Sequence, residues 1–182
     1  PICIDSEGAQ IRTRTLVGGQ IELKPGARIN IRFDDAPGDD QNLSFYPRNI
    51  ADEFLPGDII DIDFHGARLR VDEIGEHSAT AEVIQGGAIG ENKAVSVDRR
   101  IPLPYVTEKD VEAIAVGRQM GVQHFALSFT NSDEDVRKFR AHIGDTAFLI
   151  SKIESIRGLQ HLIPIADEAD AILIDRGDLS RE

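Results

Sequence analysis

Charged side chains follow two apolar, strand-like segments of the chain and could stabilise negative charge that develops in a reaction. Lys152 and Glu154 come at the end of the segment 147–151, and Asp178 comes shortly after the segment 171–175. Residues two apart project to the same side of an extended chain, so the ammonium and the carboxylate should be neighbours. Two carboxylates from adjacent strands are typical ligands of Mg²⁺ or Mn²⁺. A metal and a lysine together would stabilise an enolate or a transferring phosphoryl group.

The same pattern occurs at two further strand-like segments. Asp5-Ser6-Glu7-Gly8 follows the apolar residues 2–4, and Ser128-Phe129-Thr130 ends the segment 122–129. In parallel βα folds the loops after the strands open on one face, so the four polar clusters should converge. Taken alone, Lys152 and Glu154 also fit a structural ion pair, and Asp178 also fits a helix N-cap. The coincidence of four clusters at four strand ends favours a functional site.

A repeating unit positions these clusters. The intervals from Phe129 to Lys152 and from Lys152 to Arg176 are 23 and 24 residues, and each holds one helical and one strand-like pattern. Such units predict parallel strands joined by right-handed crossovers. Thr107-Glu108-Lys109-Asp110 resembles a capping box at the start of the first helix. A further helix is expected over 156–167.

Residues 15–100 differ from this part, because short alternating apolar runs there are separated by Pro-Gly and Gly-Gly turns. The fold class is therefore α/β: residues 1–14 and 101–182 form part of a TIM (β/α)8 barrel, and residues 15–100 form an inserted, all-β, barrel-like domain. A closed barrel needs about 250 residues. About half a barrel is expected here, with the remaining strands in a longer chain or a partner, and the 182 residues alone should be inactive.

Composition excludes several classes of partner. The chain has 20 Lys and Arg against 32 Asp and Glu, a net charge of −12, and no basic run longer than Arg99-Arg100. Nucleic acid and anionic membrane surfaces are therefore not expected partners. The single cysteine, Cys3, fits a reducing compartment, and no apolar stretch is long enough to span a bilayer. We expect a cytoplasmic protein.

Several strings, in order, resemble the pyruvate kinase family over almost the whole chain. They are Asp5 to Thr13, Pro102-Leu103-Pro104, Thr107 to Asp110, Phe125 to Phe129, Ser151-Lys152-Ile153-Glu154 and Arg176-Gly177-Asp178-Leu179. The resemblance implies phosphoryl transfer from phosphoenolpyruvate to ADP, which yields pyruvate and ATP. It also implies that residues 15–100 form a lid domain and that the full-length protein is a homo-oligomer.

The resemblance assigns roles to the barrel residues. Lys152 would stabilise charge on the phosphoryl group and the enolate, and Glu154 with Asp178 would hold Mg²⁺ or Mn²⁺. The backbone of Arg176-Gly177-Asp178 would receive the substrate carboxylate, with Phe129 also at the substrate.

Further positions match a cation site and the nucleotide side of the family. Asp5 and Ser6 match positions of a K⁺ site, Arg12 matches an arginine near the nucleotide phosphates, and Lys93 matches a lid lysine that closes over the active site. Arg12 and Lys93 are therefore expected to act with Lys152 in catalysis.

Departures from the family pattern keep two other functions open. Glu7 and Asn92 stand where the family has lysines, Ser180 replaces a glycine, and Asp175 adds a carboxylate. Because the first two remove positive charge near the phosphates, a divergent aldolase-type enzyme with metal-dependent enolate chemistry is one alternative. A non-catalytic binding or assembly module is the other, and it would tolerate loss of Lys152.

Overall fold

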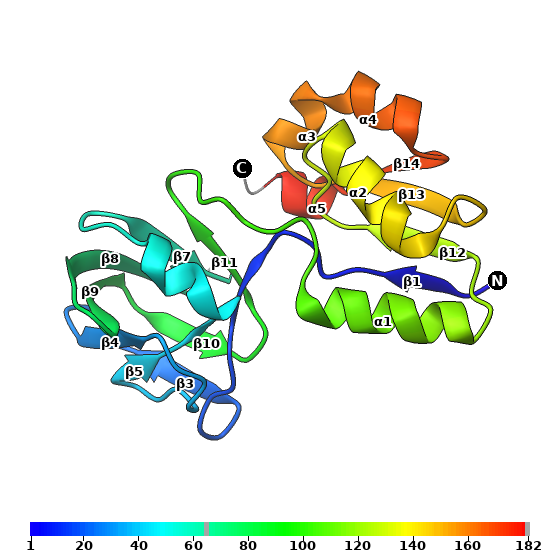
Figure 1. Ribbon diagram of the computed structural model, residues 1–182. Helices are drawn as coiled ribbons and strands as arrows, with labels where there is room; N and C mark the ends of the chain where they lie inside the picture. Colours follow the sequence, from blue (N-terminus) through cyan, green and yellow to red (C-terminus); the bar gives the residue numbers. More distant parts are fainter. Residues whose placement is uncertain (64–65, 181–182) are drawn as a thin grey trace. The chain divides into compact units, whose positions relative to one another are not determined.

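The computed structural model describes residues 1–63 and 66–180, without the side chain of Asn49, and the chain divides into two compact units (Figure 1). Unit 1 comprises Pro1–Ala9 and Leu103–Glu182, and unit 2 comprises Gln10–Pro102. Residues 10–14, which the sequence pattern placed in the barrel part, belong to unit 2. The reason is that Ile11–Thr13 pairs with strands of the inserted domain on both of its sides.

Unit 1 contains a four-stranded parallel sheet, as a partial (β/α) barrel requires. Its strands, in spatial order, are β1 (Cys3–Asp5), β12 (His124–Leu127), β13 (Phe148–Ile153) and β14 (Ala171–Ile174). The register aligns Asp5 with Ala126 and Ile153 with Ile174, so the strands end at one edge of the sheet. The α/β class with a partial barrel and an inserted all-β domain, expected from the sequence, is confirmed.

Helices connect and cover these strands. They are α1 (Glu108–Gln119), α2 (Asp133–Ile143), α3 (Ile156–Gln160), α4 (Leu162–Glu168) and α5 (Arg176–Leu179). The capping box of α1 forms as predicted, with Thr107 and Asp110 as its two members. The single helix expected over 156–167 is wrong, because the chain breaks at His161 into α3 and α4. Pro164 has no N–H to continue the ladder to Gln160, which accounts for the break.

The core of unit 1 lies between the sheet and the helices. Side chains of β12 and β13 pack against α2 and α4, and none of the core members Phe125, Leu127, Phe139, Leu149 and Ile165 is exposed. This packing fixes where β12 and β13 end. Among the described residues, the helices are all too short or too polar to cross a membrane.

Strands are the main regular structure of unit 2. An eight-stranded sheet has the order β5-β4-β9-β8-β7-β11-β2-β6, and β10 pairs with β3. Alternate residues are buried, for example Ile29 and Ile31, which is the expected period of a strand with one wet face. The strands are β2 (Ile11–Thr13), β3 (Gln20–Leu23), β4 (Arg28–Arg32), β5 (Asn42–Leu43), β6 (Phe45–Tyr46), β7 (Ile59–Ile62), β8 (Ala67–Ile74), β9 (Ser78–Gln85), β10 (Gly87–Gly90) and β11 (Ala94–Val97), with one 3-10 helix, η1 (Arg48–Glu53).

Candidate active site

A half-buried lysine and a buried glutamate meet at the end of β13. The Lys152 Nζ atom lies 3.2 Å from Glu154 Oε1 and 3.1 Å from Asp5 Oδ2. It also donates to Ser128 Oγ at 3.0 Å. The Lys152 side chain is 14% exposed and that of Glu154 only 2%. Three strand ends thus contribute to one charged cluster, and the ammonium is held between two carboxylates.

Burial and neighbouring charges shift the pKa values of both Lys152 and Glu154. Burial raises the pKa of the Glu154 carboxyl, although the Phe129 N–H and the Lys152 ammonium act in the opposite direction. Burial also acts to lower the pKa of the Lys152 ammonium, but the carboxylates of Glu154 and Asp5 outweigh it, so that this pKa is raised. Lys152 therefore carries a positive charge at neutral pH.

Phe129 positions Glu154 through its backbone. Its N–H donates to Glu154 Oε2 at 2.6 Å, and its φ is 49°. This left-handed conformation is uncommon for a residue other than glycine, and such conformations cluster at functional sites. The turn after β12 is therefore shaped to hold the carboxylate of the next strand.

The loop after β1 is joined to β12 by side-chain and backbone bonds. The Ser6 hydroxyl accepts from the Ser128 N–H at 3.0 Å, and the Ser6 N–H donates to the Ala126 carbonyl at 3.0 Å. The Ser128 hydroxyl donates to Asp5 Oδ1 at 3.0 Å. Gly8 has φ 69°, and a Cβ there would lie 2.3 Å from the Ser128 carbonyl oxygen. Only glycine fits this close approach.

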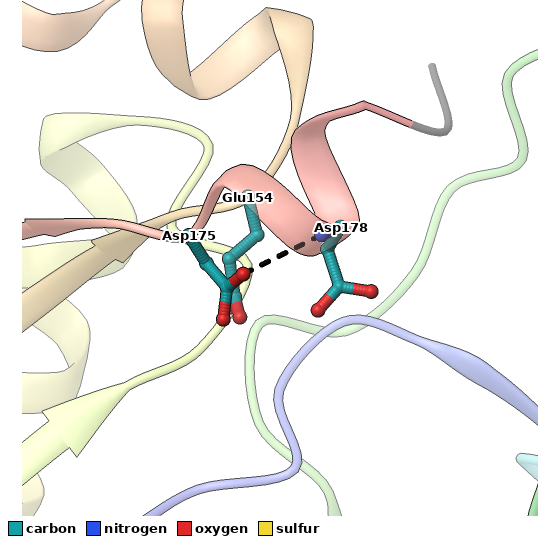
Figure 2. A group of neighbouring side chains, drawn as sticks. All are labelled: Glu154, Asp175 and Asp178. Atoms are coloured by element: carbon teal, nitrogen blue, oxygen red, sulfur yellow. Dashed lines mark hydrogen bonds between the residues drawn. The ribbon is translucent and has the colours of Figure 1, made fainter.

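Two further carboxylates lie beside Glu154, at the start of α5. Figure 2 shows Glu154, Asp175 and Asp178 with their carboxylates on the same side of α5, and one oxygen of each lies within 4.8 Å of the others. Asp175 Oδ1 accepts from the N–H groups of Gly177 at 2.9 Å and Asp178 at 3.4 Å. The N-cap of α5 is therefore Asp175, and the alternative in which Asp178 caps the helix is wrong. Asp178 lies in the first turn instead.

This donor set fits a divalent cation. Carboxylate oxygens are the hard ligands that Mg²⁺ and Mn²⁺ take, usually with few protein groups and with substrate and water completing the shell. Glu154 and Asp178 were the expected ligands, and the structure brings both together with Asp175.

Arg176 and Gly177 belong to α5 in unit 1, whereas Arg12 and Lys93 lie in unit 2. Arg12 donates through Nη1 to the Asn92 carbonyl at 3.0 Å, and Lys93 Nζ lies 3.3 Å from Asp63. The Lys93 N–H donates to the Thr13 hydroxyl at 2.8 Å. Arg12 and the turn that carries Lys93 are thus joined to each other.

Comparison with known proteins identifies the family. The family described as "Pyruvate kinase, barrel domain" matches residues 1–182. The chain belongs to the pyruvate kinase family. It is 34% identical over 187 residues to the pyruvate kinase of Clostridium perfringens, covering 100% of this chain and 40% of that protein. It is 32% identical over 182 residues to the pyruvate kinase of Methylorubrum extorquens, covering 100% and 38%. The chain thus spans about two fifths of the length of these relatives.

The residue types at the strand ends predicted the charged cluster but not the roles of Asp110 and Asp175 beside it. Asp110 was predicted only as a helix cap, whereas its carboxylate also binds the loop after β1. Asp175 was noted only as an added carboxylate. The signal available for both was an acidic residue next to a predicted strand end or helix start, which is common on protein surfaces and therefore weak.

Proposed function

We propose that the full protein transfers a phosphoryl group from phosphoenolpyruvate to ADP, which yields pyruvate and ATP. The observation that carries this proposal is the Lys152 ammonium, held 3.1 Å from Asp5 and 3.2 Å from Glu154 beside the acidic cluster of Asp175 and Asp178. A fixed positive charge next to carboxylates suited to a metal is what an anionic substrate that develops further charge requires.

Lys152 acts on both halves of the reaction. An oxygen of the ADP terminal phosphate attacks phosphorus while the bond from phosphorus to the enol oxygen breaks, so negative charge spreads over the phosphoryl oxygens and the enolate. The ammonium stabilises both charges, because Asp5, Glu154 and Ser128 already orient it and little reorganisation is needed. Protonation of the enolate at carbon then gives pyruvate.

Glu154 and Asp178 would hold Mg²⁺ or Mn²⁺, with Asp175 adjacent. The bound cation supplies positive charge to the substrate oxygens. Asp5 and Ser6 are the proposed K⁺ ligands. Arg12 is assigned to the nucleotide phosphates, and Lys93 to closure of the inserted domain.

The proposed substrate contacts of α5 use backbone N–H groups that already donate to Asp175. Arg176, Gly177 and Asp178 would receive the substrate carboxylate through their backbone, next to Phe129. The N–H groups of Gly177 and Asp178 donate to Asp175 in the structure. Substrate binding in this mode requires the Asp175 carboxylate to share or release them.

Turnover by the full-length protein tests the proposal. The assay couples pyruvate formation to a reporter reaction with phosphoenolpyruvate, ADP, Mg²⁺ and K⁺. Lys152→Met should lower kcat by about three powers of ten, which is the scale of a preorganised electrostatic contact. Lys138→Met is the matched control, because Lys138 pairs with Glu134 on the surface of α2. An absence of pyruvate formation by the wild type would refute the proposal.

A second candidate is a metal-dependent enolate enzyme of the aldolase type. Glu7 favours it, since this carboxylate lies 3.6 Å from Lys109 Nζ and brings negative charge where the resemblance expects a lysine. This enzyme should exchange the methyl protons of pyruvate with solvent in the presence of Mg²⁺ and without nucleotide. ATP formation from phosphoenolpyruvate and ADP would argue against it.

A further inference from the structure

A buried carboxylate in unit 1 binds backbone that does not belong to its own helix. Asp110, in the first turn of α1, is 4% exposed. Its Oδ1 accepts from the Glu7 N–H at 2.7 Å, and its Oδ2 accepts from the Gly8 N–H at 3.2 Å and the Thr107 N–H at 2.9 Å. A helix cap needs only the bond to Thr107. The other two bonds hold the loop that follows β1.

The opposite side of this loop is held by β12. Ser6 exchanges hydrogen bonds with the backbone of Ala126 and Ser128, and Gly8 packs directly on the Ser128 carbonyl. The loop is therefore held between the start of α1 and the end of β12. Displacement of residues 7 and 8 from α1 would loosen Asp5 and Ser6, which precede them directly.

Asp5 and Ser128 in turn hold Lys152. The ammonium donates to Asp5 Oδ2 at 3.1 Å and to Ser128 Oγ at 3.0 Å, and Ser128 donates to the other oxygen of Asp5. Each of these three groups bonds to the other two. A shift of Asp5 therefore changes two of the bonds that orient the ammonium.

We infer that Asp110 is a positioning residue, which acts through the loop of residues 5–8 on Asp5 and thereby on the Lys152 ammonium. This inference rests on the proposed function for its kinetic consequence. Asp110 does not touch the reacting groups. It sets the place of the cation that stabilises them, and misplacement by about 1 Å can cost up to a hundredfold in rate.

Asp110→Asn in the full-length protein tests the inference. An amide has one acceptor oxygen, so at least one of the bonds to Glu7 and Gly8 is lost while the Thr107 side chain still caps α1. We expect kcat to fall about tenfold or more, with the KM for each substrate changed less than twofold. Asp170→Asn is the matched control: it removes a carboxylate that accepts the Leu149 N–H at 2.7 Å, at the opposite end of the sheet. The Asp170→Asn variant should have a lower free energy of unfolding and an unchanged kcat.

Hydrogen exchange provides a readout that needs no catalysis. Peptides that contain Ser128 should exchange faster in Asp110→Asn than in the wild type, although Asp110 does not contact Ser128, and should be unchanged in Asp170→Asn. Equal exchange and equal kcat in wild type and Asp110→Asn would overturn the inference. If the wild type converts no phosphoenolpyruvate, the proposed function fails, and exchange at Ser128 alone decides the role of Asp110.

A double variant separates positioning from general destabilisation. If Asp110 acts through Asp5, the kcat of Asp5→Asn should fall less than twofold further when Asp110→Asn is added, because coupled residues are not additive. If kcat of the double variant falls by the product of the two single effects, Asp110 acts by another route and the inference is overturned.

Discussion

The two sides of the acidic cluster are held by different means. On the side of β1, β12 and β13, Glu154 is 2% exposed, and every charged group is tied to a neighbouring strand end. On the side of β14 and α5, Leu173 is 43% and Ile174 50% exposed, and α5 has no buried residue. The first side is positioned by a packed core and the second by the Asp175 cap.

This difference separates the residues by how they reach the site. Lys152 and Glu154 depend on long-range contacts, with Asp5 lying 147 positions before Lys152 in the chain. Asp178 depends on a local bond from its own N–H to Asp175. Substitutions on the buried side should therefore disturb folding and chemistry together, whereas substitutions at α5 should change ligand binding with little effect on folding.

The largest effect should come from Gly8→Ala. A Cβ at this position lies 2.3 Å from the Ser128 carbonyl oxygen, and φ is 69°, so the loop and β12 must separate. We expect a loss of about 3 kcal/mol in the free energy of unfolding, from backbone strain and a clash that the core cannot relieve. Denaturant unfolding measures it.

Gly121→Ala is the control for Gly8. Its φ is 74°, but a Cβ there meets nothing within 4 Å. In this variant only the left-handed backbone conformation is unfavourable, so the free energy of unfolding should fall by about 1 kcal/mol. Equal losses at both glycines would show that the close approach of the β1 loop to β12 contributes nothing, and the buried side would be less tightly held than we describe.

The cap of α5 should give an effect of intermediate size. Asp175→Asn keeps a capping oxygen and removes a charge within 4.8 Å of Glu154 and Asp178. If these carboxylates hold the cation, Mn²⁺ should bind about tenfold more weakly, because one attractive charge is lost. Electron paramagnetic resonance of free Mn²⁺, without substrate, measures this affinity.

Asp175→Ala separates the charge from the cap. It removes the bonds to Gly177 and Asp178 as well, so it should add a loss of about 1 kcal/mol in stability to the weaker Mn²⁺ binding. Unchanged Mn²⁺ affinity in both variants would place Asp175 outside the cation site and limit it to capping.

The sequence allowed the general plan of unit 1 to be predicted, because its signals are local. The repeated spacing from Phe129 to Lys152 to Arg176 and the Thr107 cap each depend on a short segment. The break at His161 was missed although Pro164 lies in the interior of the expected helix 156–167, where a proline interrupts the backbone hydrogen bonds. The strand partners of residues 11–13 could not be predicted, because strand pairing is decided by partners distant in the chain.

The same distinction holds for the site. Lys152, Glu154 and Asp178 could be named from their types and from motifs. The hydrogen bonds that hold the β1 loop could not be predicted in the same way, because they join Asp110 to backbone N–H groups more than a hundred positions away. Backbone donors carry no residue-type signal, so only the folded structure shows which carboxylate accepts from them.

The smallest effect concerns Asp170, at the end of the sheet opposite the site. The hydrogen bond from the Leu149 N–H, followed by the hydrogen bond from the Arg140 guanidinium, lowers the pKa of the Asp170 carboxyl below its ordinary value. A carboxyl whose pKa is lowered on folding stabilises the protein above its unfolded pKa of about 3.9, and this contribution disappears as the pH falls through the folded pKa. Because the side chain is 40% exposed, the contribution at neutral pH should stay below about 1 kcal/mol.

Unfolding of the wild type and Asp170→Asn across pH 7 to about pH 2 checks this sign. The wild type should be more stable at neutral pH, and the two curves should approach each other below about pH 4. A constant difference would mean that Asp170 acts through its shape and not through its charge. That result would limit the influence of charge on the stability of unit 1 to other sites, such as the buried Glu154 carboxylate beside Lys152.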